Sequence, residues 1–189
     1  QGPGGLIVAI AGSVGLPGGA VDLAITGSAP LALADPFLGA RTLQGIAQID
    51  LALQGQPGLG ALSGEVTTSG ARLSDPRIGN ALENIEARLT LRGGAVQVNA
   101  TGTLVTGGRI GVTGRIGLDS PRLPANLSIQ GTGLRLVDPR IYEARIDAVD
   151  LVLAGDLTGA SALSGRIVLG EVEARIPASA LGGAEPIPE

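Results

Sequence analysis

Acidic residues are the side chains best suited to chemistry in this chain of 189 residues, because the sequence contains neither His nor Cys. Without imidazole or thiol groups there is no ordinary base near neutral pH, no thiol nucleophile, no disulfide and no usual ligand for zinc or an iron–sulfur cluster. These absences argue against most hydrolytic and redox mechanisms. The remaining candidates are three Asp-Pro pairs, an acidic cluster, a glycine-rich segment and a tyrosine.

The Asp-Pro pairs begin at Asp35, Asp75 and Asp138. Aspartate before proline favours a turn or the end of a strand, because proline disfavours the helical conformation of the residue that precedes it. We therefore predict that each pair ends a strand and neither holds a metal nor transfers a proton.

The acidic cluster consists of Asp147, Asp150 and Asp156. It has neither the spacing nor the central glycine of an EF-hand, and the sequence lacks the glycine-rich nonapeptide of calcium-binding β-rolls. Asp150, like Asp50, alternates with apolar residues, so we expect both on the polar face of a strand, solvated or paired with arginine across strands. No metal is expected here.

The glycine-rich segment 107–117 lacks the spacing of phosphate-binding loops and alternates like a strand. Residues 99–101 and 126–128 match the N-glycosylation pattern, which short sequences match readily by chance. Tyr142 is expected to anchor the start of a strand. No residue is therefore predicted to be catalytic, and no cofactor is expected.

Charge and hydropathy narrow the function further. The formal net charge is −4 and only two residues are aromatic, so the chain lacks the positive stripe and stacking surface that bind nucleic acid. The mean hydropathy is high, at +0.36, yet no run reaches the roughly 18 apolar residues of a membrane-spanning helix. The apolar residues must therefore lie on the faces of sheets.

Alternation of apolar and polar residues is the dominant pattern, and it is typical of strands with one covered face. It is clear over residues 49–54, 85–92 and 96–104. Only residues 38–44 and 78–84 resemble helical turns. Further strands are expected at residues 6–12, 20–34, 62–74, 108–118, 125–137, 146–155 and 162–176.

Glycine doublets separate several of these strands, at Gly18-Gly19, Gly93-Gly94 and Gly107-Gly108. Because glycine adopts positive φ without steric cost, the doublets predict hairpins and hence antiparallel neighbours. Within 125–137 and 162–176 the apolar residues change parity, which indicates a bulge or a bend.

The chain also repeats itself. Similar strand sequences occur at 49–55, 85–93 and 149–155, and the first and third are followed by ALSGEV and ALSGRI. Repeats that cannot bury an apolar face alone are expected to stack along one sheet.

Three architectures would accommodate about ten such strands: a sandwich with an aliphatic core, a β-solenoid, or a strongly curved sheet whose apolar face lines a groove. The groove explains the glycines and bulges best, since these features curve a sheet. It also explains the hydropathy, because a large apolar surface is rarely exposed unless it binds something. We predict one all-β domain over residues 1–189, built of long antiparallel strands around an apolar concave face.

The residues expected to line this groove are apolar, alternate along strands, and are called the predicted wall residues below. They are Val21, Leu23, Ile25, Ile49, Leu51, Leu53, Ile85, Leu89, Leu91, Val96, Val98, Ile110, Val112, Ile116, Leu127, Ile129, Val149, Leu151, Leu153, Leu163, Ile167 and Leu169.

Residues 138–177 resemble the C-terminal part of TamB-family proteins, the inner-membrane-anchored periplasmic component of the translocation and assembly module. The resemblance lies in strand rhythm and in the succession of DP, YEA, DL-L-G and L-G-I elements, and residues 75–120 look like the preceding repeat. It implies a β-taco with an apolar interior, a periplasmic location in a Gram-negative cell, and partnership with the BamA-like outer-membrane protein TamA.

The resemblance also implies two roles: assembly of outer-membrane proteins and autotransporters, and passive phospholipid transfer between the two membranes. We expect the chain to be a non-enzymatic fragment of a larger protein whose inner-membrane anchor lies outside it. Phospholipid acyl chains or unfolded outer-membrane strands are the expected partners. The alternative is a surface passenger or adhesin built as a β-solenoid with a closed aliphatic core.

Overall fold

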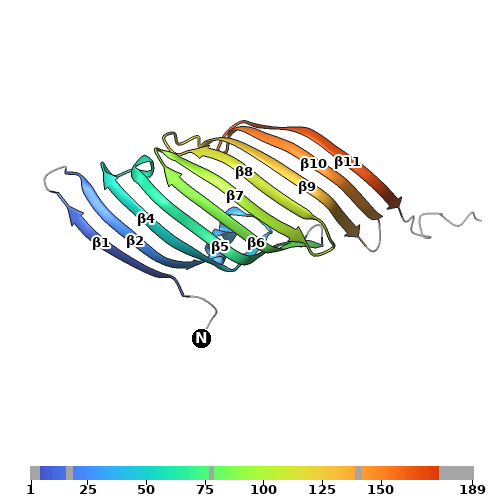
Figure 1. Cartoon of the computed structure of the whole chain (residues 1–189), viewed down its shortest axis with the longest axis horizontal. Helices are drawn as coiled ribbons and strands as arrows, with labels where there is room; N and C mark the ends of the chain where they lie inside the picture. The colour runs from blue at the N-terminus through green and yellow to red at the C-terminus, as the bar shows by residue number, and fades with distance from the viewer. Residues whose placement is uncertain (1–4, 16–18, 77–78, 139–141, 175–189) are drawn as a thin grey trace, which may run out of the picture.

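A computed structural model describes residues 5–15, 19–76, 79–138 and 142–174. These residues form one antiparallel sheet of eleven strands that does not close, as predicted (Figure 1). The strands are β1 (Ile7–Val14), β2 (Val21–Pro30), β3 (Thr42–Gln44), β4 (Ile46–Gly55), β5 (Leu62–Asp75), β6 (Asn80–Arg92), β7 (Ala95–Leu104), β8 (Arg109–Gly117), β9 (Pro124–Asp138), β10 (Tyr142–Asp156) and β11 (Ser161–Ala174).

The sheet is a meander in which strands that follow each other in sequence lie side by side. The order is β1-β2-β4-β5-β6-β7-β8-β9-β10-β11, and the short β3 pairs with the far end of β5. The repeated sequences at 49–55, 85–93 and 149–155 lie in β4, β6 and β10. Each is separated from the next by an even number of antiparallel steps, so these three strands run in the same direction.

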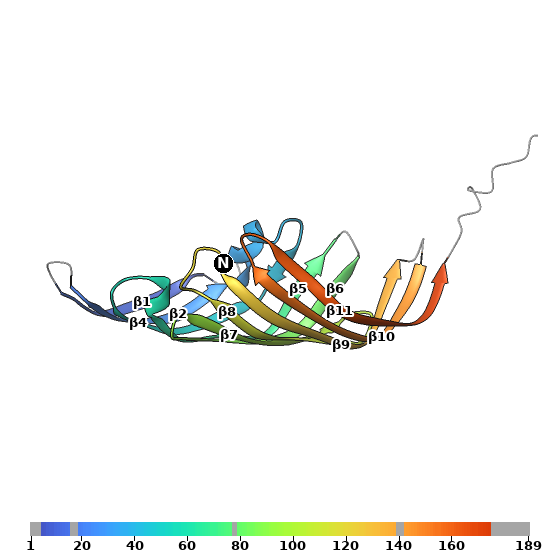
Figure 2. The same cartoon turned by 90° about the horizontal axis from the view of Figure 1, so that it is seen from above.

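The sheet is curved into an open trough (Figure 2). Two short 3₁₀ helices, η1 (Leu31–Phe37) and η2 (Leu59–Ala61), interrupt the meander. Gly45, between β3 and β4, faces Ala71 and Leu31, so η1 packs onto the sheet at the place where the chain bends. Ala71 is only 1% exposed as a result.

The positions of the helical turns differ from the prediction. Residues 42–44 and 80–84 belong to β3 and β6, whereas the strand expected over 20–34 stops at Pro30 and continues as η1. Asn84 has a φ of 51° and forms a bulge, which disturbs the alternation and made a strand look like a turn.

The Asp-Pro prediction holds for Asp75 and Asp138, which are the last residues of β5 and β9. It is wrong for Asp35, which lies inside η1. The Asp35 carboxylate instead accepts a hydrogen bond from the Leu43 backbone N–H at 2.7 Å, and so links η1 to β3.

The predicted parity changes are present and lie along the bend. Gly70 in β5, Asn84 in β6 and Gly133 in β9 all have positive φ. Beyond the bend the paired residues are Leu136, Ala144 and Val172, which continue the apolar face with the opposite parity. Positive-φ residues and bulges are devices that curve a sheet, so they account for the trough.

Glycine is also required inside three straight strand segments. Gly64, Gly114 and Gly165 have φ of 120°, 149° and 139°. A Cβ at these positions would lie 2.2, 2.1 and 2.1 Å from a carbonyl oxygen of the neighbouring strand. Such a contact is impossible without moving the backbone, so any side chain there distorts the sheet.

We predict that Gly114→Ala destabilises the protein by about 2 kcal/mol or more, because it combines a strained φ with a backbone clash. Gly111→Ala is the matched control on the same strand, since its Cβ would make only ordinary contacts, the nearest at 3.7 Å. That substitution should change stability by less than about 0.5 kcal/mol. Urea unfolding followed by circular dichroism measures both, and equal losses would contradict the steric argument.

Candidate binding groove

The register of the strands places all the predicted wall residues on one face of the sheet. Residues directly paired across antiparallel strands share a face, as do residues two apart on one strand. One continuous row of paired residues crosses the whole sheet: Val8, Gly27, Ile49, Val66, Leu89, Val98, Gly114, Leu127, Leu153 and Leu163. We call this side the apolar face and the other the polar face.

Bulges do not move the predicted wall residues off this face. A Cβ on Gly102 would lie 3.2 Å from Ile85 and 3.5 Å from Leu82, which places both side chains on the same side of β6. Beyond the second bulge, Leu169 pairs with Ile146, which pairs with Leu134.

The apolar face also contains residues that the sequence analysis did not single out. They include Val8, Ile10 and Val14 in β1, Leu62 and Val66 in β5, Leu82 in β6, Leu134 and Leu136 in β9, and Ile146 in β10. The alternation of Val8, Ile10, Val14, Leu62 and Val66 was visible in the sequence. For Leu82, Leu134, Leu136 and Ile146, the bulges hid which parity to follow.

The apolar face carries no charged side chain between the rims of the described sheet. Its two acidic residues, Asp75 and Asp138, are the last residues of their strands. Thr68 places a hydroxyl group in the middle of the wall. Its Oγ1 donates a hydrogen bond to the Ile46 carbonyl oxygen at 2.8 Å. This part of the wall therefore offers a ligand aliphatic surface and no free charge.

The wall is open to solvent. The apolar residues with less than a tenth of their surface exposed are few and mostly small: Val21, Ala47, Ala71, Ala81, Leu91, Ala95, Ala125, Leu134 and Val149. No large side chain among the described residues is fully buried. Leu51, Leu89 and Leu151, in the middle of the wall, are half-buried. A sandwich or a solenoid would bury such residues completely, so neither describes this sheet.

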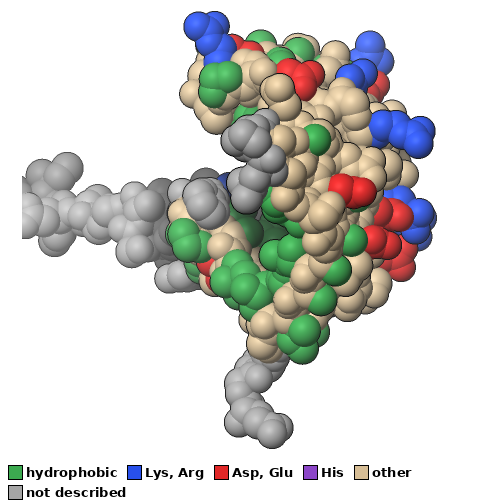
Figure 3. Space-filling view, turned by 90° about the vertical axis from the view of Figure 1, so that its left-hand side faces the viewer, with side chains coloured by type: hydrophobic (Ala, Val, Ile, Leu, Met, Phe, Trp, Pro, Cys, Tyr) green, Lys and Arg blue, Asp and Glu red, His purple; other side chains and the backbone are tan. Residues whose placement is uncertain are grey.

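Apolar side chains gather in the hollow of the trough, and acidic and basic side chains stand on its outer surface (Figure 3). The apolar face is thus the concave one. An open groove with an aliphatic lining is the main candidate site of the molecule.

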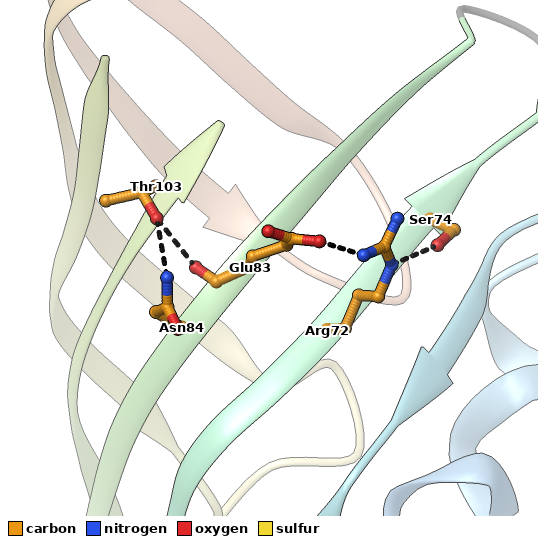
Figure 4. Close-up of polar contacts among 5 residues, drawn as sticks. All are labelled: Arg72, Ser74, Glu83, Asn84 and Thr103. Carbon is orange, nitrogen blue, oxygen red and sulfur yellow. Dashed lines mark hydrogen bonds and ion pairs between the residues drawn. The ribbon is translucent and has the colours of Figure 1, made fainter. Parts of the chain in front are cut away.

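The polar face is held by ion pairs between strands. Arg88 of β6 lies 2.8 Å from Glu65 of β5, and Arg72 of β5 pairs with Glu83 of β6. Figure 4 shows Arg72 and Glu83 beside the bulge at Asn84, whose side-chain amide donates to Thr103 at 3.3 Å. These contacts fasten the convex side where the sheet bends, but exposed pairs contribute under about 1 kcal/mol each.

The acidic residues, the tyrosine and the glycine-rich segment that the sequence analysis considered do not come together into a site. Asp150 lies on the polar face opposite Arg166, and Asp50 is exposed between Thr26 and Glu65. No group of three or more acidic residues that could hold a metal ion occurs in the part of the chain that the structure describes. Tyr142 begins β10, as predicted, and segment 107–117 is mostly β8.

A shallow depression of about 700 Å³ lies on the polar face between β4 and β7. Gln48, Thr67, Arg88, Asn99 and Thr101 are among its lining residues. It is widely open, and Arg88 is engaged with Glu65. It therefore has less to offer a ligand than the continuous apolar wall.

Comparisons with models of protein families, with curated proteins and with solved structures find no match for this chain. The resemblance to the TamB family therefore stays a prediction. Among the described residues, no helix is long and apolar enough to cross a membrane.

An open groove and a closed core predict different costs for truncating a wall residue. Leu151→Ala should cost only about 1 kcal/mol, because its side chain already contacts solvent and leaves no enclosed cavity. Leu134, on the same face but 6% exposed, is the matched control, and Leu134→Ala should cost about 3 kcal/mol. Urea unfolding decides: equal costs near the larger value would mean that the groove is closed.

Proposed function

We propose that this chain is a non-enzymatic module that holds aliphatic chains, foremost the acyl chains of phospholipids, in its groove. The observation that carries the proposal is the uncharged wall, which continues across all the long strands on the concave face while charge is kept on the convex face. Contiguous apolar surface of this extent is rarely left exposed without a binding role.

Burial is the proposed mechanism. Removing apolar surface from water favours binding by roughly 25 cal/mol per Å², or about 0.8 kcal/mol for each methylene. Because Leu, Ile and Val recur along the whole wall, no position binds a methylene much more tightly than the next. An acyl chain therefore meets only small barriers as it moves along the groove.

The polar headgroup would remain at the open side of the trough. Desolvating a charged headgroup against the wall would cost several kcal/mol, since the middle of the wall offers no free partner. The groove thus favours a ligand with an aliphatic part that enters and a polar part that stays in water, as in a phospholipid.

The resemblance to the TamB family extends this proposal to a cellular role. A periplasmic TamB-like protein anchored in the inner membrane, and partnered by a TamA-like outer-membrane protein, would use such a groove to move phospholipid between the membranes. It would use the same groove to assist the assembly of outer-membrane proteins such as autotransporters.

An outer-membrane protein strand is the second candidate cargo. Side chains on one face of a strand repeat every two residues, and so do the aliphatic side chains on each strand of the wall. The apolar side of an unfolded outer-membrane strand therefore fits this surface as well as an acyl chain does.

Site-specific photo-crosslinking tests the proposal directly. A photoreactive residue is placed at Leu51, Leu89 or Leu151, and the purified protein is mixed with phospholipid vesicles and irradiated. We expect lipid adducts by mass spectrometry at these three positions. The outward controls are Gln54, Arg88 and Asp150, which should give none. The absence of adducts at the wall positions would refute the lipid proposal.

The same variants distinguish the two cargoes when an unfolded outer-membrane protein replaces the vesicles. Protein adducts at the wall together with no lipid adducts would assign the groove to protein assembly.

A charge on the wall should block lipid transfer. Leu89→Asp should abolish transfer of a fluorescent phospholipid between donor and acceptor vesicles, because the carboxylate cannot be desolvated against an acyl chain. Thr90→Asp is the matched control on the polar face of the same strand and should transfer at the normal rate. Circular dichroism first establishes that both variants are folded, and equal transfer by the two would contradict the mechanism.

A further inference from the structure

Residues 31–35, called the Asp35 segment below, alternate like a strand but form the first part of η1. On β2 the apolar face carries every second residue from Val21 to Ala29. The same two-residue step continues to Leu31 and Leu33. Because side chains two residues apart on a strand share a face, an extension of β2 through the segment would place both leucines on the apolar face. In η1, Leu33 is instead 59% exposed.

The same sequence unit is a strand elsewhere in the sheet. Residues 31–35, 71–75 and 134–138 read LALAD, ARLSD and LRLVD, and each is followed by proline. The second and third copies end β5 and β9, where each pairs with the strand that follows it. The leucine two residues before the aspartate is half-buried in both, at Leu73 and Leu136. Of these three copies, the first alone is helical.

The backbone ladder of β2 already extends one step into the Asp35 segment. The Leu31 N–H donates to the Gly45 carbonyl oxygen at 3.0 Å, which continues the antiparallel ladder between β2 and β4. In such a ladder, hydrogen-bonded pairs recur every two residues on each strand. The next hydrogen-bonded pair would therefore join Leu33 to Leu43 of β3, whose partner on the other side, Leu73, lies on the apolar face.

The Asp35 carboxylate stands where the carbonyl group of that strand would be. Its Oδ1 accepts a hydrogen bond from the Leu43 N–H at 2.7 Å, so this N–H is not used by β5 although β3 pairs with β5. In an extended ladder the same N–H would donate to the Leu33 carbonyl oxygen. Exchange of one acceptor for the other leaves the donor satisfied in both arrangements, which keeps the two close in free energy.

We propose that the Asp35 segment is a switch: it forms η1 in the free protein, and it extends β2 and pairs with β3 when an aliphatic chain lies in the groove. The switch rests on the proposed function, because it is a response of the same groove. The extension adds the Leu33 side chain to the apolar wall beside Leu43, so a bound chain buries more apolar surface. A ligand shifts an equilibrium through such a difference in its contacts with the two states.

NMR chemical shifts of the Cα and Cβ atoms of residues 32–34 test the switch, because helical and extended backbone shift these signals in opposite directions. The probe is a short-chain phosphatidylcholine, added to the isotopically labelled protein below its micelle concentration. We expect helix-type shifts without lipid and strand-type shifts at saturation. Methyl signals of Leu89 and Leu151 report lipid in the groove independently. Residues 97–99 of β7 are the control and should stay strand-type throughout.

The methyl signals separate failure of the switch from failure of lipid binding. Changed methyl signals together with helix-type shifts at residues 32–34 would overturn the switch and leave the proposed function standing. Strand-type shifts already present in the free protein would overturn the switch as well. Methyl signals that stay unchanged at every lipid concentration would refute the proposed function, and the switch with it.

Substitution of Asp35 provides a second readout. Asp35→Ala removes the acceptor that holds the Leu43 N–H in η1, so the lipid concentration at the midpoint of the shift change should fall roughly tenfold. Asp22→Ala is the matched control, because that carboxylate accepts from the Gln54 side-chain amide at 3.3 Å on the polar face. Its midpoint should equal that of the unsubstituted protein. An unchanged midpoint in Asp35→Ala would overturn the switch.

Discussion

The ladder of backbone hydrogen bonds between neighbouring strands is the interaction on which the rest of the structure depends. A globular domain is usually held by large side chains buried in a core, but no large side chain among the described residues is fully buried here. Nine successive antiparallel pairings connect β1 to β11 and fix the register that puts aliphatic residues on one face. The apolar wall remains available to a ligand because the backbone, rather than a second layer, holds the sheet together.

Curvature is the second requirement, and it is met by backbone conformation instead of packing. Gly70, Asn84 and Gly133 bend their strands along one line, and Arg72 and Glu83 pair on the convex side of that bend. A flat sheet with the same side chains would expose its apolar face to any neighbour. The bend encloses that face on two sides, which suits an extended aliphatic ligand and shields the wall from indiscriminate contact.

Most of the fold could be predicted from the sequence, because alternation with period two reports directly on which face a side chain occupies. All the predicted wall residues share the apolar face for this reason. The failures have local physical causes. The bulge at Asn84 interrupts the alternation, so the start of β6 was predicted as a helical turn. The apolar stretch before Asp35 was predicted as part of a strand, but it forms η1. Side chains such as Leu134 and Ile146 were missed because parity beyond a bulge depends on backbone angles that no residue pattern specifies. The residue pattern does not identify the ligand of the wall. The sequence suggests phospholipid or outer-membrane strands only through the resemblance to the TamB family.

The sequential order of the strands has a consequence for how such a protein evolves. Each strand pairs mainly with its neighbours in sequence, so a hairpin can be duplicated or deleted without breaking pairings elsewhere in the sheet. Each added pair of strands would lengthen the trough by about 10 Å. The related sequences of β4, β6 and β10 are what such duplications would leave behind. Trough length is therefore a property that evolution can adjust in hairpin-sized steps.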